Sequence, residues 1–168
     1  MISSTQLSDG VYTWTVEALD AWGRSSGLTD TWLFSVDATP PEVPAPLAPA
    51  AGTTELSNPV PFTWTAVSDN LSGVLSYILY VTGQASYSKT VGESVTATTL
   101  SLGADGVYAW SVEAIDRADN RSGLSLPLTF TLDATAPERP DLIAPPDGTL
   151  TRSAVITLAW AWRDQVVT

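Results

Sequence analysis

The acidic side chains offer the most chemistry in this sequence. Glu17 and Asp20, and again Glu113 and Asp116, lie three residues apart, and such carboxylate pairs can act as acid and base. The chain contains no histidine and no cysteine, which removes the commonest general base together with all thiolate chemistry. No glycine-rich phosphate loop is present. Because nothing in the sequence indicates a cleft around the carboxylate pairs, we predict that the chain is not an enzyme.

A second set of carboxylates lies near two proline-rich segments, residues 39–44 and 135–140. Oxygen ligands that converge at a joint between domains could hold Ca²⁺, which takes six to eight of them. The candidate ligands are Asp37, Glu42, Asp69, Asp133 and Glu138, with Asp20, Asp116, Asp119, Asn120 and Asp164 in or near the same joints and the loops that follow. No EF-hand spacing is present, and isolated aspartates mostly cap turns. Calcium binding at the joints and capping of turns are therefore alternative interpretations of these carboxylates, and no other cofactor is predicted.

The composition excludes several classes of partner. The chain carries 7 basic and 18 acidic residues, a formal net charge of -11. Such a surface repels phosphate groups, so we expect no binding to nucleic acid or to anionic lipid. Hydrophobic residues make up 44% of the chain, which is ample for a core. No apolar run approaches the roughly 20 residues of a membrane span, and the first residues do not resemble a signal peptide.

A repeat with an offset of 96 residues organises the chain. Residues 105–116 repeat residues 9–20, and 25 of the 56 aligned pairs between 9–64 and 105–160 are identical. A period of this length fits a β-sandwich module of about 100 residues and is too long for a helical solenoid. We predict one complete module over residues 38–133, the last third of a module over 1–37, and the first third of another over 134–168.

Alternation of apolar and polar residues predicts β-strands throughout. Within the complete module the strands are expected near residues 44–48, 60–66, 74–82, 86–91, 94–102, 107–116 and 127–133. Seven short strands separated by turns are typical of an immunoglobulin-like sandwich. The tryptophans that recur at the 96-residue offset are predicted to be core residues, and the repeated tyrosines to form tyrosine corners. These residues are Trp14, Trp64, Trp110 and Trp160, and Tyr12 and Tyr108.

Three further tryptophans do not follow the repeat. Trp22, Trp32 and Trp162 correspond at the 96-residue offset to Ala118, Leu128 and Ala66. Their presence in the two outer segments allows three interpretations: local variation of the core, an interface, or a surface that stacks on sugar rings.

Several motifs resemble bacterial extracellular immunoglobulin-like and fibronectin type III-like repeats. In that group a Gly-x-Tyr-x-Trp strand, here Gly106 to Trp110, precedes an Asp-x-x-x-Asn-x-Ser loop, here Asp116 to Ser122. The segments 135–137 and 69–73 resemble the group's inter-module joint and the turn after its second strand. The resemblance implies tandem all-β modules located outside the cell or on its surface. It implies little about function, because such modules serve as stalks, adhesins, spacers and enzyme appendages.

The incomplete outer modules leave the function open. The chain is expected to be a structural piece of a longer surface or secreted multi-repeat protein, with neighbouring modules as its partners. Alternatively, identical subunits assemble head-to-tail into a filament, the tail of one supplying early strands and the head of the next late strands. Head plus tail lack equivalents of about residues 73–96, which counts against a complete shared module. A carbohydrate-binding module is the third alternative.

Overall fold

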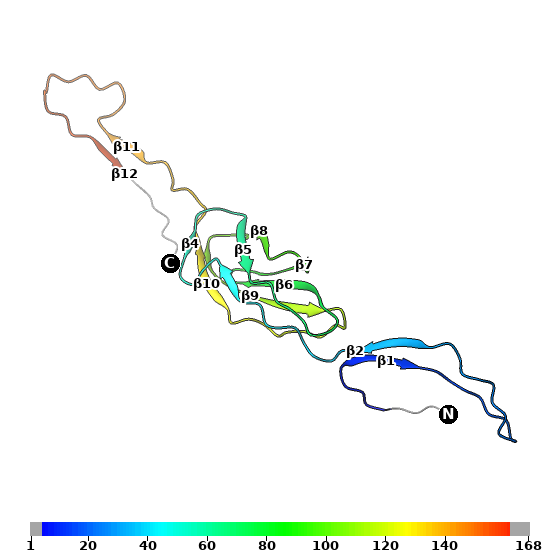
Figure 1. The fold of residues 1–168 in the computed structure, drawn as a ribbon. Coiled ribbons are helices and arrows are strands. Elements are labelled where there is room, and N and C mark those ends of the chain that lie inside the picture. The colour runs from blue at the N-terminus through cyan, green and yellow to red at the C-terminus, as the bar shows by residue number, and fades with distance from the viewer. Residues whose placement is uncertain (1–4, 162–168) are drawn as a thin grey trace.

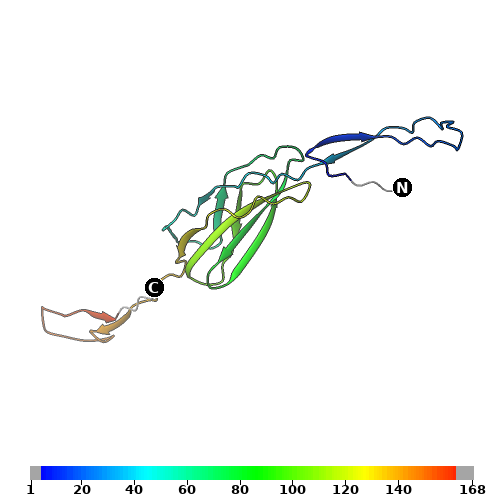
Figure 2. The ribbon, with the colours of Figure 1, turned by 90° about the horizontal axis from the view of Figure 1, so that it is seen from below.

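The computed structural model describes residues 5–161, and every regular element in that range is a β-strand. Figure 1 shows a β-sandwich in the middle of an elongated molecule, with a two-stranded hairpin beyond each end of it. Figure 2, turned by 90°, shows the same succession of parts. The predicted all-β fold class is confirmed. Among the described residues no helix is long and apolar enough to cross a membrane.

The sandwich consists of a five-stranded and a three-stranded sheet. The larger sheet has the order β4 (Thr54–Glu55), β10 (Leu128–Leu132), β9 (Gly106–Asp116), β6 (Val74–Thr82) and β7 (Ser86–Gly92). The smaller sheet has the order β3 (Pro46–Ala48), β5 (Val60–Trp64) and β8 (Ala97–Leu100). All neighbouring strands are antiparallel except β4 and β10, which run parallel.

The core lies between these two sheets and is rich in aromatic rings. Phe62 on β5 packs edge-on against Trp110 on β9, with 5.2 Å between ring centroids, and against Phe130 on β10 at 5.8 Å. The side chain of Trp110 is 1% exposed, and its indole N–H donates to the carbonyl oxygen of Pro49 at 3.0 Å. Trp64 is buried in the same core. The predicted core role of Trp64 and Trp110 is therefore confirmed.

The same prediction is wrong for the two outer tryptophans. Trp14 ends β1 (Gly10–Trp14), which pairs only with β2 (Trp32–Val36), and its side chain is 48% exposed. Trp160 lies on β12 (Ala159–Ala161), which pairs only with β11 (Asp141–Ala144), and it is 61% exposed. A two-stranded sheet has no second layer to cover its aromatic face. The outer tryptophans therefore stay exposed although their sequence pattern is that of core residues.

The strand positions within the sandwich follow the predicted ones closely, with one addition. The short strand β4 was not predicted, because two residues are too few to show alternation. Both tyrosine corners are confirmed: the hydroxyl of Tyr108 donates to the carbonyl oxygen of Ala104 at 2.6 Å, and that of Tyr12 donates to Ser8 at 2.7 Å. The strands of both sandwich sheets lie between residues 46 and 132, while the module boundaries at 38 and 133 stay a prediction.

Candidate functional site

Three carboxylates meet where the N-terminal hairpin joins the sandwich. Asp37 follows β2, Asp69 lies in the loop between β5 and β6, and Asp116 ends β9. One carboxylate oxygen from each lies within 4.8 Å of the other two. Asp116 is fully buried, and the other two side chains are partly buried. We call these three residues the acidic cluster. It draws together segments that are far apart in the sequence.

The loop from β5 to β6 wraps around the Asp69 side chain. Its Oδ2 accepts hydrogen bonds from the backbone N–H groups of Leu71 at 3.1 Å and Gly73 at 2.9 Å. Gly73 has a φ of 79°, which glycine adopts without strain, and a Cβ there would lie 2.8 Å from Nη1 of Arg117. Burial raises the pKa of Asp69, but hydrogen bonds from Gly73 and its neighbours outweigh burial and hold the pKa below its ordinary value of 3.8.

The other two carboxylates of the cluster are held by loop amides. Oδ1 of Asp116 accepts from the backbone N–H groups of Ala118 and Asn120, both at 2.8 Å, and its Oδ2 accepts from the Asn120 side-chain amide. The same amide donates to the backbone carbonyl of Asp37 at 3.1 Å. Oδ2 of Asp37 accepts from the backbone N–H of Ser72 at 2.8 Å. The segment that leaves β2 is thus attached to the sandwich at two points.

The structure groups the predicted calcium ligands differently from the sequence. Asp37 and Asp69 come together, whereas Glu42, Asp133 and Glu138 lie outside the acidic cluster. Glu42 is exposed, Glu138 is exposed beyond β10, and Asp133 directly follows β10. The sequence indicates Asp116 only as one of the loop residues near the joints. Its position at the end of the strand predicted over residues 107–116 is the sequence feature that points to a place in the cluster.

A second arrangement recurs at both ends of the sandwich, and sequence reasoning missed it. The carboxylate of Asp105, just before β9, accepts hydrogen bonds from the backbone N–H groups of Ala134 at 2.9 Å and Thr135 at 3.0 Å. Asp9, 96 residues earlier, accepts from the N–H of Ala38 at 2.8 Å and from the hydroxyl of Thr39. We call this arrangement the exit clamp, because it fixes the chain where it leaves the last strand of a repeat.

Electrostatics agree with the geometry of the exit clamp. The hydroxyl of Thr135 and the amide of Ala134 lower the pKa of Asp105, and those of Thr39 and Ala38 lower the pKa of Asp9. The residues of the clamp are identical in the two repeats, and this identity is the sequence feature that indicates the clamp.

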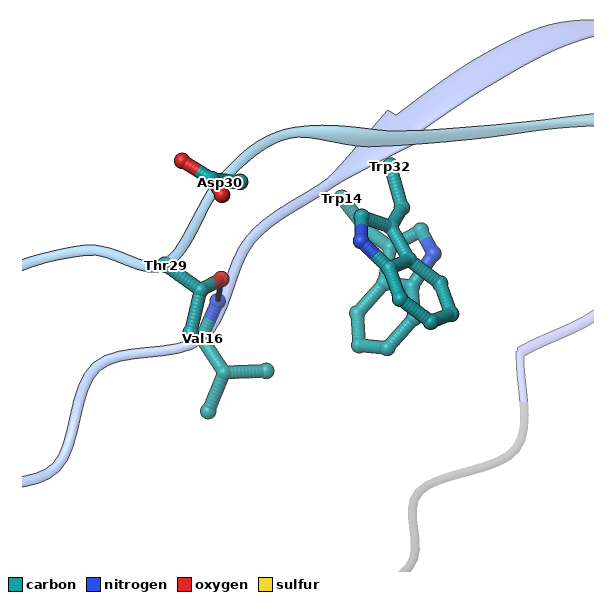
Figure 3. A pocket seen from close by; sticks show the side chains of 5 residues that line it. All are labelled: Trp14, Val16, Thr29, Asp30 and Trp32. Atoms are coloured by element: carbon teal, nitrogen blue, oxygen red, sulfur yellow. Dashed lines mark hydrogen bonds between the residues drawn. The ribbon is translucent and has the colours of Figure 1, made fainter.

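The N-terminal hairpin presents an exposed aromatic face. The rings of Trp14 and Trp32 meet edge to face with 5.7 Å between centroids, and Figure 3 shows them beside an open pocket. The pocket has a volume of about 300 Å³ and is also lined by Val16, Thr29 and Asp30. The hydroxyl of Thr29 accepts a hydrogen bond from the N–H of Val16, drawn as a dashed line in Figure 3.

This pocket corresponds to part of the sandwich core. At the 96-residue offset its lining residues Trp14, Val16 and Thr29 align with Trp110, Val112 and Ser125, all of which are buried. The pocket is therefore the inner face of a sheet that lacks an opposing sheet, and it need not be shaped for a ligand.

The described candidate tryptophans lie on different elements of the N-terminal hairpin. Trp32 is 67% exposed on β2, whereas Trp22 is 83% exposed in the loop between β1 and β2, with the guanidinium of Arg24 5.8 Å from its ring centroid. Trp162 lies outside the described residues. Interface, core and sugar-stacking roles for these residues all stay predictions.

The carboxylate pairs considered for acid–base chemistry are occupied by hydrogen bonds. Glu113 accepts from the hydroxyl of Tyr80 at 2.8 Å and pairs with Arg121 at 2.6 Å. Asp20 pairs with Arg24 at 2.6 Å and accepts from two backbone N–H groups. These partners give Glu113 a structural role within β9, and Asp20 one in the loop between β1 and β2.

Comparison with known proteins places similar segments inside polysaccharide-degrading enzymes. The chain is 37% identical over 117 residues to part of Chitinase A1 of Niallia circulans, which covers 68% of the chain and 16% of that protein. It is 33% identical over 138 residues to part of Exoglucanase B of Cellulomonas fimi (77% of the chain, 12% of that protein). It is 35% identical over 129 residues to part of Endoglucanase B of Cellulomonas fimi (71% and 12%). The chain therefore spans less than a fifth of the length of these relatives.

No protein-family model matches the chain. Among solved structures, fibronectin(III)-like modules of Clostridium thermocellum CbhA align with a TM-score of 0.47 and 19% identity, covering 77% of this chain and 64% of that one. Within the chain itself, a three-stranded and a five-stranded sheet enclose an aromatic core, with a tyrosine corner before β9. The chain is thus an all-β protein with one immunoglobulin-like or fibronectin type III-like β-sandwich, flanked in sequence by two two-stranded hairpins.

Proposed function

We propose that the chain is a non-catalytic spacer in a bacterial extracellular protein, where it separates neighbouring modules and holds them in a defined arrangement. The observation that carries the proposal is the exit clamp. Two equivalent aspartates each use both carboxylate oxygens for this: Asp9 fixes the chain behind β2, and Asp105 fixes it behind β10. A free linker needs no such fixation, whereas a spacer that sets the direction of the next module does.

The relatives support a location outside the cell. Their names describe a chitinase and two glucanases, enzymes of polymers too large to enter a bacterial cell. Because the similar segment is a small part of each enzyme, we infer that modules of this kind accompany a catalytic region and are not that region themselves. Neighbouring modules of the same polypeptide are the partners that this role requires.

Small-angle X-ray scattering combined with polysaccharide assays tests the spacer role. We expect an elongated particle whose maximum dimension is unchanged when excess chitin or cellulose oligosaccharides are added. We also expect no release of reducing sugar from either polymer, and no retention of the chain on either insoluble polymer. A scattering profile that requires freely jointed modules would contradict the spacer proposal, as would hydrolysis of either polymer.

Assembly into filaments is a second candidate, favoured by the exposed aromatic face of β1 and β2. The counterparts of Tyr12, Trp14 and Phe34 are each at most 1% exposed in the sandwich. Another copy could cover that face, but the hairpins at residues 10–36 and 141–161 contain no counterpart of β6 or β7, so a composite of these two hairpins would lack both strands. Size-exclusion chromatography and electron microscopy at micromolar concentration distinguish the two. A monodisperse monomer favours the spacer, and fibres lost on deletion of residues 1–37 favour the filament.

Carbohydrate binding is a third candidate, favoured by the 83% exposure of the Trp22 ring. Aromatic rings exposed in this way can stack on sugar rings. Retention on chitin or cellulose that Trp22→Ala weakens, without a fall in melting temperature, would establish this role. Equal retention of both variants would exclude Trp22 as the binding residue.

A further inference from the structure

We propose that the acidic cluster binds one calcium ion, which joins the segment after β2 to two loops of the sandwich. This site is independent of the proposed spacer role, since a spacer with or without a bound ion could separate modules. Its three carboxylates come from three separate segments, and a cation among them would connect all three.

Two buried oxygen atoms at the cluster have no hydrogen-bond partner. Oδ1 of Asp69 and Oγ of Ser72 are closed off from solvent and make no hydrogen bond among the described residues. Together with one tryptophan N–H they are the three orphaned buried side-chain atoms in that part of the chain. Buried polar atoms are rarely left without a partner. Since Oδ2 of Asp69 is already bonded to loop amides, Oδ1 is the oxygen free to bind a cation.

Among residues 5–161, no basic side chain forms a salt bridge with the three carboxylates. The salt bridges among residues 5–161 join other carboxylates to Arg24, Arg117 and Arg121. The guanidinium of Arg117 contacts the loop by donating to the backbone carbonyls of Ser72 at 3.4 Å and Val74 at 3.0 Å, and it pairs with Glu93. Three like charges converge here around the buried carboxylate of Asp116, and a cation among them would compensate their charge.

The repeat provides an internal comparison. Asp20 occupies the position of Asp116, and both cap the following loop with backbone N–H groups two and four residues later. At Asp20 the residue four positions on is Arg24, which forms an ion pair with the carboxylate. At Asp116 the equivalent residue is the neutral Asn120. The protein thus supplies its own cation at one copy of the loop and leaves the other copy anionic.

The donor atoms select for calcium among common cations. The three carboxylates offer hard oxygen ligands, and the chain has no histidine or cysteine to hold a softer metal. Calcium accepts an irregular shell of six to eight oxygens, so backbone carbonyls and water can complete the set. Magnesium demands a near-ideal octahedron, which ligands from three separate loops do not readily provide.

Calorimetric titration of the full chain with calcium chloride, after treatment with EDTA, tests the site. We expect binding of one equivalent and a higher melting temperature with calcium, which EDTA reverses. Magnesium chloride is expected to bind at least ten-fold more weakly. Absence of calcium binding at millimolar concentration would overturn the proposal, and equal affinity for magnesium would overturn the assignment to calcium.

Matched variants locate the ion. Asp69→Asn keeps an oxygen for the loop amides and removes the charge, so calcium affinity should fall at least ten-fold while the melting temperature in EDTA stays close to that of the parent. Asp133→Asn is the control, because Asp133 is the repeat counterpart of Asp37 and lies outside the cluster. Calcium affinity should not change in this control. Loss of affinity in Asp133→Asn, or full affinity in Asp69→Asn, would show that any ion binds elsewhere.

Discussion

The hairpin of β1 and β2 and its counterpart within the sandwich, β9 and β10, share local structure and differ in burial. Tyr12 opposes Phe34 and Trp14 opposes Trp32, in the same register as their counterparts 96 residues later. Even the ring geometry repeats: Tyr12 and Phe34 stack at 5.5 Å and 21°, and Tyr108 and Phe130 at 5.8 Å and 22°. The first pair of strands is exposed to solvent, and the second lies in the core.

The comparison separates what local sequence determines from what packing adds. Strand pairing, the tyrosine corner, the aspartate-capped loop and the exit clamp form in both copies. Exclusion of water occurs only where a second sheet covers the aromatic face, which at the sandwich is supplied by β3, β5 and β8. Most of the stabilisation from the aromatic residues should therefore be confined to the sandwich.

Replacing the equivalent tryptophans Trp14 and Trp110 should give the largest difference in unfolding free energy between hairpin and sandwich. Trp110→Ala leaves a cavity beside Phe62 and deprives Pro49 of a hydrogen-bond donor, so we expect a loss of about 3–5 kcal/mol in the free energy of unfolding. Trp14→Ala removes a ring that is already half-exposed and should change the sandwich transition by about 0.5 kcal/mol or less. Chemical denaturation followed by tryptophan fluorescence measures both. Similar losses at the two positions would show that the hairpin face is covered in solution.

The tyrosine corners should show a smaller contrast in the same direction. Tyr108→Phe removes the hydrogen bond to Ala104 in a part-buried setting and should cost about 1–1.5 kcal/mol of unfolding free energy. Tyr12→Phe removes an equivalent bond where water can replace the hydroxyl, so the sandwich transition should not shift. Thermal unfolding by circular dichroism compares the two variants with the parent. A shift in Tyr12→Phe as large as that in Tyr108→Phe would mean that hairpin and sandwich unfold as one unit.

The exit clamps should make stability depend weakly on acid pH. Hydrogen bonds from Thr135 and Ala134 lower the folded-state pKa of Asp105 below 3.8. A group with a depressed folded pKa contributes stability that is present above the unfolded pKa and is lost as pH falls through the folded value. The melting-temperature difference between the parent and Asp105→Asn should therefore be present near pH 6 and vanish well below pH 3.8.

Asp9→Asn provides the matched control for the clamp. Its carboxylate also has a lowered pKa, but it fixes the segment after the hairpin, so the sandwich should melt as in the parent. Carboxyl titration by NMR should place both aspartates below their ordinary pKa. A titration of Asp105 at or above 3.8 would contradict the clamp.

The smallest effect is expected at the exposed loop tryptophan. Trp22 aligns with Ala118, so Trp22→Ala makes the first loop resemble the second. Because the ring is 83% exposed, stability should change by no more than about 0.5 kcal/mol. Thermal unfolding checks this expectation, and a larger loss would indicate that the ring packs against another molecule.

The fold was predictable from the sequence because alternation and repetition act locally. Strands such as β6 and β9 alternate over nine and eleven residues, and the repeat marks the same tyrosine and tryptophan twice. The exposure of the outer tryptophans could not be predicted from the alternation of apolar and polar residues, because Trp14 and Trp110 lie in nearly identical sequences. Their difference depends on whether another sheet lies opposite, which is a property of tertiary structure.

The acidic cluster was only partly predictable. Asp37 and Asp69 were chosen for their nearness to a predicted joint, and the same reasoning chose Glu42 and Asp133. Which carboxylates belong to the acidic cluster depends on which loops meet at one end of the sandwich. Asp116 joins because β9 is long enough to carry its final residue to that end.

The parallel pairing of β4 and β10 has a consequence for mechanical force. These strands lie near the start and the end of the sandwich, so tension along the polypeptide pulls them in opposite directions. In a parallel pair this loads the hydrogen bonds in shear: Gly52 to Thr129 at 2.8 Å, Thr131 to Thr53 at 2.9 Å and Asp133 to Glu55 at 2.9 Å. All three must break together, whereas an antiparallel pair pulled from one end would unzip bond by bond. We therefore expect the pairing of β4 and β10 to resist tension better than an antiparallel pair of the same length would.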